Sequence, residues 1–429
     1  MPRALDTHVV RNPSHDFTRF PPPTARHPDV VVAFDQYGGD RLRVRVYGPQ
    51  VPPGRYGEVL AILDVRPEKV QRLGLALRRR WQAEFVSARP WMPDGKPDPG
   101  RPDHPYATQV DLTGKDEELR PVLDELATQG AHLLFDVLLA DFNLRALWVR
   151  QVLIEVLGRK DLRVRFDSDV LFLPWPLLCL PRDPTAGSDL DALFLRFLGH
   201  RHQIEQTGGY YPELPDPQEP MLPLASPSVS LNHDTGVDAA GRTKAAEVAA
   251  VLRTDTTFVE RRTRQDLLDD IVAGKLDEQF MYFWCHGRFR SAETEAPLLV
   301  VQLSDGRDID AHTLLARQGA ADGTLLRRNP LVLLNACYAG IPGDAELAYL
   351  GGALIQAGAA GVLGPQIEMP QLFAAEYALL YVTRYLSGEE TAGTIAHNLA
   401  RHFADVHRNP LGLAYALHCG MDNRLERGL

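Results

Sequence analysis

The sequence lacks the features that mark membrane proteins and disulfide-bonded secreted proteins. Its 429 residues include only four cysteines, which are widely spaced and form no CxxC pair. Neither a disulfide framework nor a zinc ribbon is therefore indicated. No apolar run reaches the roughly 18 residues needed to cross a bilayer, and the amino-terminal segment lacks the apolar stretch of a signal peptide. We therefore expect a cytoplasmic protein with reduced thiols and no membrane partner.

The sequence also lacks an excess of basic residues. Asp and Glu number 56 against 46 Lys and Arg, which gives a formal net charge of −10 and a pI of about 5.8. A generally basic nucleic-acid-binding surface is therefore excluded, and no direct nucleic-acid partner is expected. The chain is 45% hydrophobic and 24% charged, as is typical of globular proteins. Its length favours two or three structural units.

Two Pro-rich stretches, at 89–106 and 211–227, predict linkers. We therefore divide the chain into an N-terminal extension at 1–110, a middle segment at 111–225 and a C-terminal segment at 226–429.

The extension is predicted to be a small α+β unit. Segments 29–34 and 41–47 are expected to form a hairpin, and 67–85 an amphipathic helix. The Arg run at 78–80 is interpreted as a solvated helix face, with an anion or partner site as the alternative.

The rest of the chain predicts an α/β fold. The middle segment shows a long helical pattern at 117–158, broken near 141–143, and then a strand at 162–166. In the C-terminal segment, apolar strands alternate with helices. The predicted strands are 228–232, 258–260, 279–285, 298–303, 330–336 and 360–363; the predicted helices are 239–252, 263–273, 311–317, 346–357, 373–386 and 391–407. This alternation indicates a mainly parallel sheet flanked by helices on both faces.

Two strand ends carry reactive side chains. His286 follows the apolar strand 279–285, and Cys337 follows the apolar strand 330–336. Catalytic groups collect at the carboxyl ends of parallel strands. A His about 50 residues before a Cys is also the spacing found in caspases. Both His286 and Cys337 therefore occupy the kind of position at which catalytic groups are found.

Other Cys and His residues are expected to be structural. Adjacent strand residues point to opposite faces, so Cys285 cannot share a cleft with His286 and is expected in the core. Cys179 and Cys419 are given the same interpretation. Helical steps of five spread His397, His402 and His407 around the helix axis, so they are interpreted as solvated and not as a metal site. No metal and no cofactor are expected.

Five motifs in order carry a family resemblance. They are LPWPLL at 173–178, CHG at 285–287, NAC at 335–337, a Gly/Ala-rich helix and turn at 351–359, and NPLGLAY at 409–415. From about residue 115 onward the chain resembles the CHAT domain, a bacterial branch of the caspase-like cysteine proteases related to caspases and separases. Pro176 replaces the acidic residue usual in the first motif. The resemblance implies a caspase-like fold in which a non-catalytic pseudo-protease half precedes the catalytic half.

The resemblance also implies peptide-bond hydrolysis through an acyl-enzyme. Cys337 would attack the scissile carbonyl as a thiolate, and His286 would protonate the leaving amine. The backbone N–H groups of Gly287 and Cys337 would form the oxyanion hole. A glycine at 287 leaves room for the substrate to approach.

The substrate pocket departs from that of caspases. The Cys motif reads N-A-C-Y-A-G, which does not match the caspase signature and puts cleavage after Asp in doubt. Asp344 and Glu346 could line a pocket for a basic substrate residue, or could complement the start of the next helix. The segment 364–368 replaces a family Trp, and we assign its Glu368 to the same substrate pocket.

Proteins of this family commonly act in regulated cleavage, including antiphage defence and cell death, where a neighbouring sensor switches the protease on. This chain shows no obvious sensor, so a separate activator protein and a protein substrate are expected, with 1–110 as the docking surface. Two alternatives stay open. One is a catalytically silent scaffold or binding module, and the other is an effector gated by a nucleotide second messenger.

Overall fold

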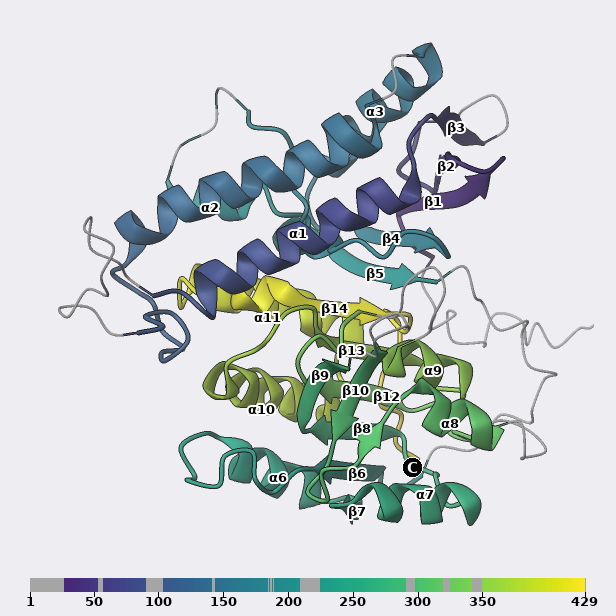
Figure 1. Cartoon of the computed structure of the whole chain (residues 1–429), viewed down its shortest axis with the longest axis vertical. Helices are drawn as coiled ribbons and strands as arrows, with labels where there is room; N and C mark the ends of the chain where they lie inside the picture. Colours follow the sequence, from purple (N-terminus) through teal and green to yellow (C-terminus); the bar gives the residue numbers. More distant parts are fainter. Residues whose placement is uncertain are drawn as a thin grey trace, which may run out of the picture.

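A computed structural model shows how the chain is arranged (Figure 1). The residues it describes are 27–52, 57–89, 103–140, 143–183, 185, 187, 189–208, 224–290, 298–318, 325–341 and 349–428. Most of the two predicted linkers lies outside these residues. No helix in the described residues combines the length and apolar character needed to cross a membrane.

The central feature of the described residues is an 11-stranded sheet with the order β3-β2-β1-β4-β5-β14-β13-β12-β8-β6-β7. Its strands in chain order are β1 (Val30–Tyr37), β2 (Arg41–Tyr47), β3 (Glu58–Leu63), β4 (Arg163–Ser168), β5 (Gln203–Thr207), β6 (Ser228–His233), β7 (Thr257–Arg261), β8 (Phe280–Trp284), β12 (Leu331–Asn335), β13 (Gly361–Pro365) and β14 (Tyr415–His418).

Two blocks of parallel strands make up this sheet. The first contains β1, β4, β5 and β14, and the second contains β13, β12, β8, β6 and β7. The blocks meet where β13 pairs antiparallel with β14. The hairpin strands β2 and β3 extend the first block by antiparallel pairing. The predicted mainly parallel α/β fold is therefore confirmed.

Helices cover the sheet. In chain order they are α1 (Pro67–Phe85), α2 (Asp116–Ala131), the π-helix η2 (His132–Leu138), α3 (Leu144–Leu157), the 3-10 helix η3 (Trp175–Leu177), α4 (Leu190–Phe194), α5 (Leu198–Arg201), α6 (Ala245–Arg253), α7 (Arg264–Val272), α8 (Ala311–Gln318), α9 (Leu350–Gln356), α10 (Gln371–Ser387), α11 (Ala392–Asp405) and the 3-10 helix η4 (Pro410–Ala414).

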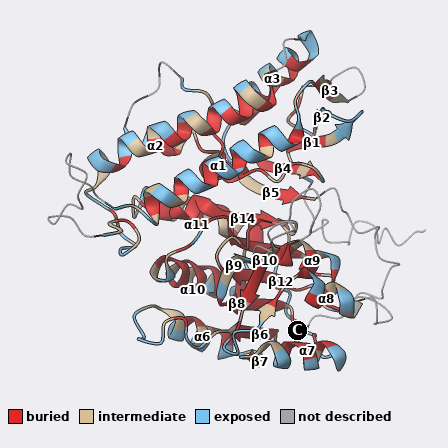
Figure 2. Cartoon of the chain, viewed as in Figure 1, coloured by how far each residue is buried: buried red, intermediate tan, exposed pale blue. Residues whose placement is uncertain are grey.

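The two faces of the second block pack against different helices. Phe280, Tyr282 and Trp284 of β8 belong to a core shared with α6, α10 and α11. The alternating residues Met281 and Phe283 belong to a second core with α7, α8 and α9. Because strand side chains alternate between faces, β8 is buried along its whole length, as Figure 2 shows.

A small second sheet begins at the predicted catalytic His. In the described residues it has the strand order β11-β10-β9, formed by β9 (His286–Arg290), β10 (Leu298–Gln302) and β11 (Asp308–Ile309). Cys285 alone separates β8 from β9, so the chain leaves the large sheet immediately before His286. The sequence pattern did not predict β9, because its five residues are exposed or only partly buried and form no apolar run.

Several predicted elements are confirmed. The hairpin and α1 form as expected, and the break in the long helical segment lies between η2 and α3. Thr263 caps α7 in a capping box with Asp266. The predicted helix 239–252 begins only at Ala245, and the NPLGLAY motif at 409–415 forms the 3-10 helix η4 and leads into β14.

The extension joins the same sheet as the middle segment, because β1 pairs with β4. The strands β3 and β5 were not predicted. The division of the chain into three units stays a prediction.

Two interpretations of single residues are wrong. Arg78 is not part of a solvated face, since only 5% of it is exposed; Arg79 and Arg80 are exposed as expected. His397 is buried as well, and its Nε2 lies 3.0 Å from the carbonyl oxygen of His200. Both residues lie on helix faces that pack against other elements. The charge of a side chain and its spacing along the helix do not show which face is covered.

The LPWPLL segment forms part of the aromatic core of the first block. The Trp175 ring stacks on Phe166 with centroids 4.0 Å apart and on Phe34 with centroids 5.7 Å apart. The neighbouring Pro176 packs so closely on Gly199 that a Cβ there would lie 2.6 Å from the Cβ of Pro176. Proline at 176 is therefore a packing residue in this chain.

We predict that Trp175→Ala lowers the free energy of unfolding by about 3–5 kcal/mol, because it opens a cavity between two stacked rings. Urea denaturation followed by circular dichroism measures the change. Trp148→Ala is the matched control, since 45% of Trp148 is exposed. Equal effects of the two substitutions would contradict the structure.

Candidate active site

Three neighbouring parallel strands end side by side at one edge of the sheet. β8 lies between β6 and β12, and its last residue, Trp284, pairs in register with His233 of β6 and Asn335 of β12. The residues that follow these three ends include Asp234, His286 and Cys337. The parallel register therefore brings the predicted His and Cys to the same edge and adds a carboxylate.

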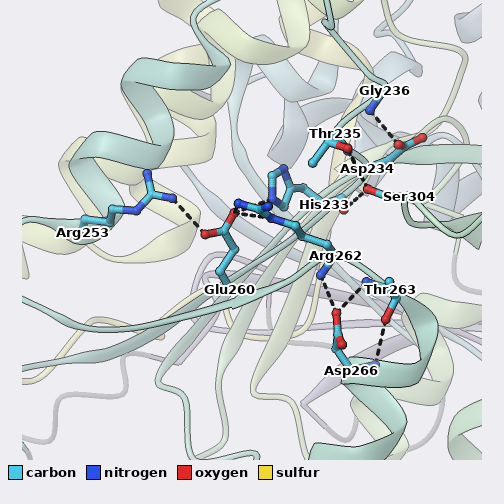
Figure 3. Close-up of polar contacts among 10 residues, drawn as sticks. All are labelled: His233, Asp234, Thr235, Gly236, Arg253, Glu260, Arg262, Thr263, Asp266 and Ser304. Atoms are coloured by element: carbon cyan, nitrogen blue, oxygen red, sulfur yellow. Dashed lines mark hydrogen bonds and ion pairs between the residues drawn. The ribbon is translucent and has the colours of Figure 1, made fainter.

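His286 is the first residue of β9, and 57% of its side chain is exposed. Its Nε2 lies 3.9 Å from Oδ2 of Asp234, which is ion-pair distance but too long for a hydrogen bond. Two contacts hold Asp234 in place. Its backbone N–H donates to the carbonyl oxygen of Trp284 at 2.9 Å. Its Oδ1 accepts from the N–H of Gly236 at 2.8 Å (Figure 3).

The loop that carries Asp234 is fixed by further polar contacts. The Thr235 N–H donates to Oγ of Ser304 at 2.9 Å, and Nε2 of His233 lies 2.8 Å from Oε1 of Glu260 (Figure 3). Burial alone would raise the pKa of Glu260, but hydrogen bonds from Arg262, His233 and Arg253 lower it to about 2. Glu260 therefore stays charged and anchors the end of β6 at every physiological pH.

The Cys337 loop is anchored at its start. The Asn335 side chain is buried; its Nδ2 donates to the carbonyl oxygen of Ala374 at 2.9 Å, and its Oδ1 accepts from the Tyr415 hydroxyl at 2.8 Å. This explains why an amide side chain stands two residues before the Cys: both of its polar atoms are satisfied inside the core.

A constrained backbone follows Cys337. Tyr338 has a φ of 63°, in the left-handed region that non-glycine residues seldom adopt. The Gly340 N–H donates to the carbonyl oxygen of Pro365 at 2.8 Å, and a Cβ at 340 would lie 2.0 Å from the carbonyl oxygen of Gly364. The end of β13 thus holds the loop, and it does so only because residue 340 has no side chain.

Gly287 lies against the backbone of Cys337. A Cβ at 287 would lie 2.3 Å from the carbonyl oxygen of Cys337 and 2.9 Å from its nitrogen. Real Cβ atoms do not approach so closely, so any side chain at 287 would push the two loops apart. The CHG motif therefore requires glycine for close backbone packing, in addition to any role in substrate access.

The Cys337 thiol sits among backbone donors and one acidic side chain. Burial raises the pKa of the Cys337 thiol above its usual range, and the charge of Glu368 raises it further. The N–H groups of Met369, Cys337 and Gly287 act in the opposite direction, because they would donate to a thiolate. Burial dominates, so the resting side chain is a thiol at neutral pH. The two N–H groups predicted for the oxyanion hole lie beside the sulfur.

The predicted acidic pocket is described only in part. Asp344 and Glu346 lie outside the described residues. Glu368 is exposed and lies close enough to influence Cys337. Its Oε1 accepts from the Tyr338 hydroxyl at 3.2 Å, and the same hydroxyl also donates to Oε1 of Gln82 in α1 at 2.7 Å. The structure therefore brings one of the three predicted acids to the site and adds a contact from the extension.

The remaining cysteines are separate from this site in their chemistry. Cys285 and Cys179 are buried, and Cys419 is partly buried. Burial raises the pKa of all three thiols. In the described part of the chain, no group of three or more His, Cys, Asp or Glu side chains could hold a metal ion.

Sequence reasoning missed Asp234. The available signal was its position: it comes two residues after the end of the predicted strand 228–232, close to a strand end as His286 and Cys337 are. What the sequence could not supply was the order of strands in the sheet, which places β6 next to β8.

Comparison with known proteins gives one family and several relatives. Residues 128–397 match the family model described as CHAT domain. A protein named probable protease, from Vitiosangium sp. (strain GDMCC 1.1324), is 29% identical over 160 residues. This match covers 36% of the chain and 20% of that protein, so the chain spans a fraction of its relative's length.

Two crystal structures of the Saccharomyces cerevisiae separase–securin complex also align with the chain. Each alignment covers 91% of this chain and 30% of the other. The TM-scores are 0.42 and 0.46, with sequence identities of 10% and 8% respectively.

We predict that Cys337 in the resting chain is alkylated with a pH midpoint above about 8.5, the value of an ordinary thiol. A raised pKa means that less thiolate is present at neutral pH, so the rate rises only under alkaline conditions. Glu368→Gln is expected to move the midpoint to lower pH, because it removes a negative charge that disfavours the thiolate. Iodoacetamide labelling, followed peptide by peptide with mass spectrometry, measures both.

Glu389→Gln, at an exposed glutamate in another part of the chain, is the control and should leave the midpoint unchanged. A midpoint well below 8.5 in the unmodified chain would show instead that the thiolate is already stabilised at rest.

Proposed function

The chain belongs to the CHAT domain family, and on that premise we propose that it is a cysteine endopeptidase that cleaves a protein partner through Cys337 and His286. The observation that carries the proposal is the convergence of His286, Gly287 and Cys337 at adjacent strand ends, with the Gly287 backbone packed on that of Cys337. A relative named probable protease supports the same reaction class.

The proposed reaction uses groups of this chain only. The His286 imidazole takes the proton of the Cys337 thiol, and the thiolate attacks the carbonyl carbon of the scissile bond. The N–H groups of Gly287 and Cys337 donate to the oxyanion that forms. The C–N bond then breaks as His286 returns the proton to the leaving amine, and water hydrolyses the remaining thioester.

We assign Asp234 a positioning role in this reaction. Its carboxylate lies 3.9 Å from Nε2 of His286, and the Trp284 and Gly236 backbone groups fix its own orientation. A negative charge at this distance favours the imidazolium that exists while the thiolate attacks. Asp234 therefore acts through His286 and does not touch the substrate.

The resting site fits an enzyme that is switched on by another protein. Burial keeps Cys337 protonated, and more than half of the His286 side chain is exposed. A partner that covers the exposed imidazole and stabilises the Cys337 thiolate would activate this site. We propose that this activator is a separate sensor protein, as in regulated bacterial defence or cell-death proteolysis, and that residues 1–110 contribute to its docking.

The negative charge of Glu368 beside Cys337 affects which substrate residue is preferred at the cleaved position. Glu368 lies near Cys337 and would repel an acidic side chain bound there. Together with the absence of the caspase signature, this favours a basic side chain at the cleaved position over an aspartate.

We predict that Cys337→Ala abolishes cleavage of the partner and that His286→Ala lowers its rate by about 10²–10⁴-fold, the usual contribution of a general acid–base group. Mass-spectrometric profiling of new protein N-termini in cells that express the chain with its activator measures the cleavage. His312→Ala, at an exposed His in α8, is the matched control and should retain activity.

Cleavage of the partner by the Cys337→Ala variant would contradict the proposal that Cys337 is the nucleophile. Partner binding without any cleavage in the unmodified, activated chain would favour the silent scaffold instead.

We predict that Asp234→Asn lowers kcat for cleavage by about fivefold or less and leaves KM nearly unchanged, because a partly exposed ion pair is worth about 0–1 kcal/mol and Asp234 does not touch the substrate. The direction follows because the imidazolium that forms during the attack loses its anionic neighbour. Steady-state rates of partner cleavage measure both constants. Asp277→Asn, at an exposed position, is the control. An unchanged kcat in Asp234→Asn would contradict the positioning role.

A further inference from the structure

A pocket of about 560 Å³ lies between α1 of the extension and the Cys337 loop. One wall is the face of α1 from Glu68 to Gln82, and the other includes Phe289, Tyr338 and Tyr349. Arg78 and Gln366 also line it. The pocket is therefore built jointly by the extension and by the segments that follow His286 and Cys337.

This pocket adjoins the proposed catalytic residues. Tyr338 directly follows Cys337, and Phe289 lies on β9, the strand that begins with His286. The Phe289 ring packs on Tyr338 with centroids 5.0 Å apart and on Tyr349 with centroids 5.9 Å apart. A peptide chain that reaches Cys337 would therefore pass beside this apolar wall.

Arg78 is a buried cation without a counter-ion in the described residues. Only 5% of it is exposed, and its Nη2 donates to the carbonyl oxygen of Phe172 at 2.7 Å and to Oε1 of Gln366 at 3.1 Å. Within the described part of the chain, its Nε has no hydrogen-bond partner. Burial lowers the pKa of Arg78 to about 9, so it still carries its charge at neutral pH. Burying an uncompensated charge is strongly unfavourable.

Gln366 presents a second unsatisfied donor in the same pocket. Its side chain is fully buried, its Oε1 is committed to Arg78, and its Nε2 has no partner. Two buried donors without acceptors in one pocket are unusual, because buried polar groups are almost always paired. Among the described residues, the pocket therefore lacks acceptors for Arg78 Nε and Gln366 Nε2.

The charged side chains that line the pocket are mainly basic, which suits the binding of an anionic acceptor. Arg72 and Arg79 also line the pocket and are exposed, whereas Glu68 is the one acidic side chain among its lining residues. The pocket is thus basic within a chain whose net charge is −10. An anion would find a positive entrance, an apolar wall and a buried guanidinium.

We propose that this pocket binds the carboxylate of a Glu or Asp side chain in the protein that the chain cleaves, with Arg78 and Gln366 as specificity-determining donors. This rests on the proposed function, because it deepens the substrate class of the same site. A guanidinium fork pairs with a carboxylate through short, charge-assisted hydrogen bonds. The methylene groups of an acidic side chain would pack on Phe289 and Tyr338. The extension would thereby take part in substrate selection through α1.

The test uses the full chain with Cys337→Ala and a library of capped octapeptides synthesised as matched pairs, Glu in one member and Gln in the other. Peptides retained by the protein are quantified by mass spectrometry. We expect the Glu member of a pair to be retained about tenfold or more over its Gln partner, the usual effect of a hydrogen bond to a charged group.

Arg78→Met should erase this preference, and Arg78→Lys, which keeps the charge but loses the fork, should restore part of it. Arg80→Met is the matched control. Arg80 lies on α1, outside the residues that line the pocket, where it pairs with Glu84 at 2.9 Å and with Glu125 at 3.3 Å. If Arg78→Met fails to fold, the double variant Arg72→Gln with Arg79→Gln is tested instead, since both residues are exposed. We expect its preference for Glu over Gln peptides to be several-fold weaker than that of the unmodified chain.

The proposal falls if no peptide is retained, if Glu and Gln members are retained equally, or if the preference survives in a folded Arg78→Met variant. Its failure is distinct from that of the proposed function. If the chain prefers Glu peptides but never generates new protein N-termini, the pocket proposal is supported and the peptidase proposal is contradicted. If it cleaves its partner without preferring Glu peptides, the peptidase proposal is supported and the pocket proposal is contradicted.

Discussion

The contact between the Gly287 backbone and the Cys337 backbone is the constraint on which the site depends. It brings the end of β8 against the end of β12 and sets two N–H groups beside the Cys337 sulfur. The parallel register of β6, β8 and β12 makes this contact possible, since Trp284 pairs with residues of both neighbours. The sheet therefore sets the positions of Asp234, His286 and Cys337, because each of them follows the end of its strand by only one or two residues.

The extension is part of this arrangement and not a separate appendage. Its hairpin continues the large sheet through β1 and β4, and α1 crosses to the catalytic block. There Gln82 accepts from the Tyr338 hydroxyl, and Arg78 donates to Gln366 at the end of β13. A change in α1 would therefore reach the residue next to the nucleophile. This coupling gives the proposed docking of an activator on the extension a physical route to the site.

Much of the fold could be predicted from the sequence, because the elements of the second block have strong local patterns. The apolar strand 330–336, the capped helix at Thr263 and the hairpin at 29–47 all appear close to their expected limits. Among the elements that were missed, β3, β5 and β9 have partly exposed or polar faces whose pairing depends on distant strands. Arg78 and His397 were misjudged because charge and spacing do not show which helix face is covered.

The sequence by itself determined the candidate nucleophile and its partner, because each follows an apolar strand, where the carboxyl end of a parallel sheet exposes reactive side chains. It also supplied the glycine at 287, although the close backbone packing that requires this glycine is seen only in the structure. Only the tertiary structure decided the rest. Strand order brought Asp234 to within 3.9 Å of His286, burial set the protonation of Cys337, and α1 delivered a buried cation to the pocket beside it. These properties come from residues far apart in the chain, so no local pattern contains them.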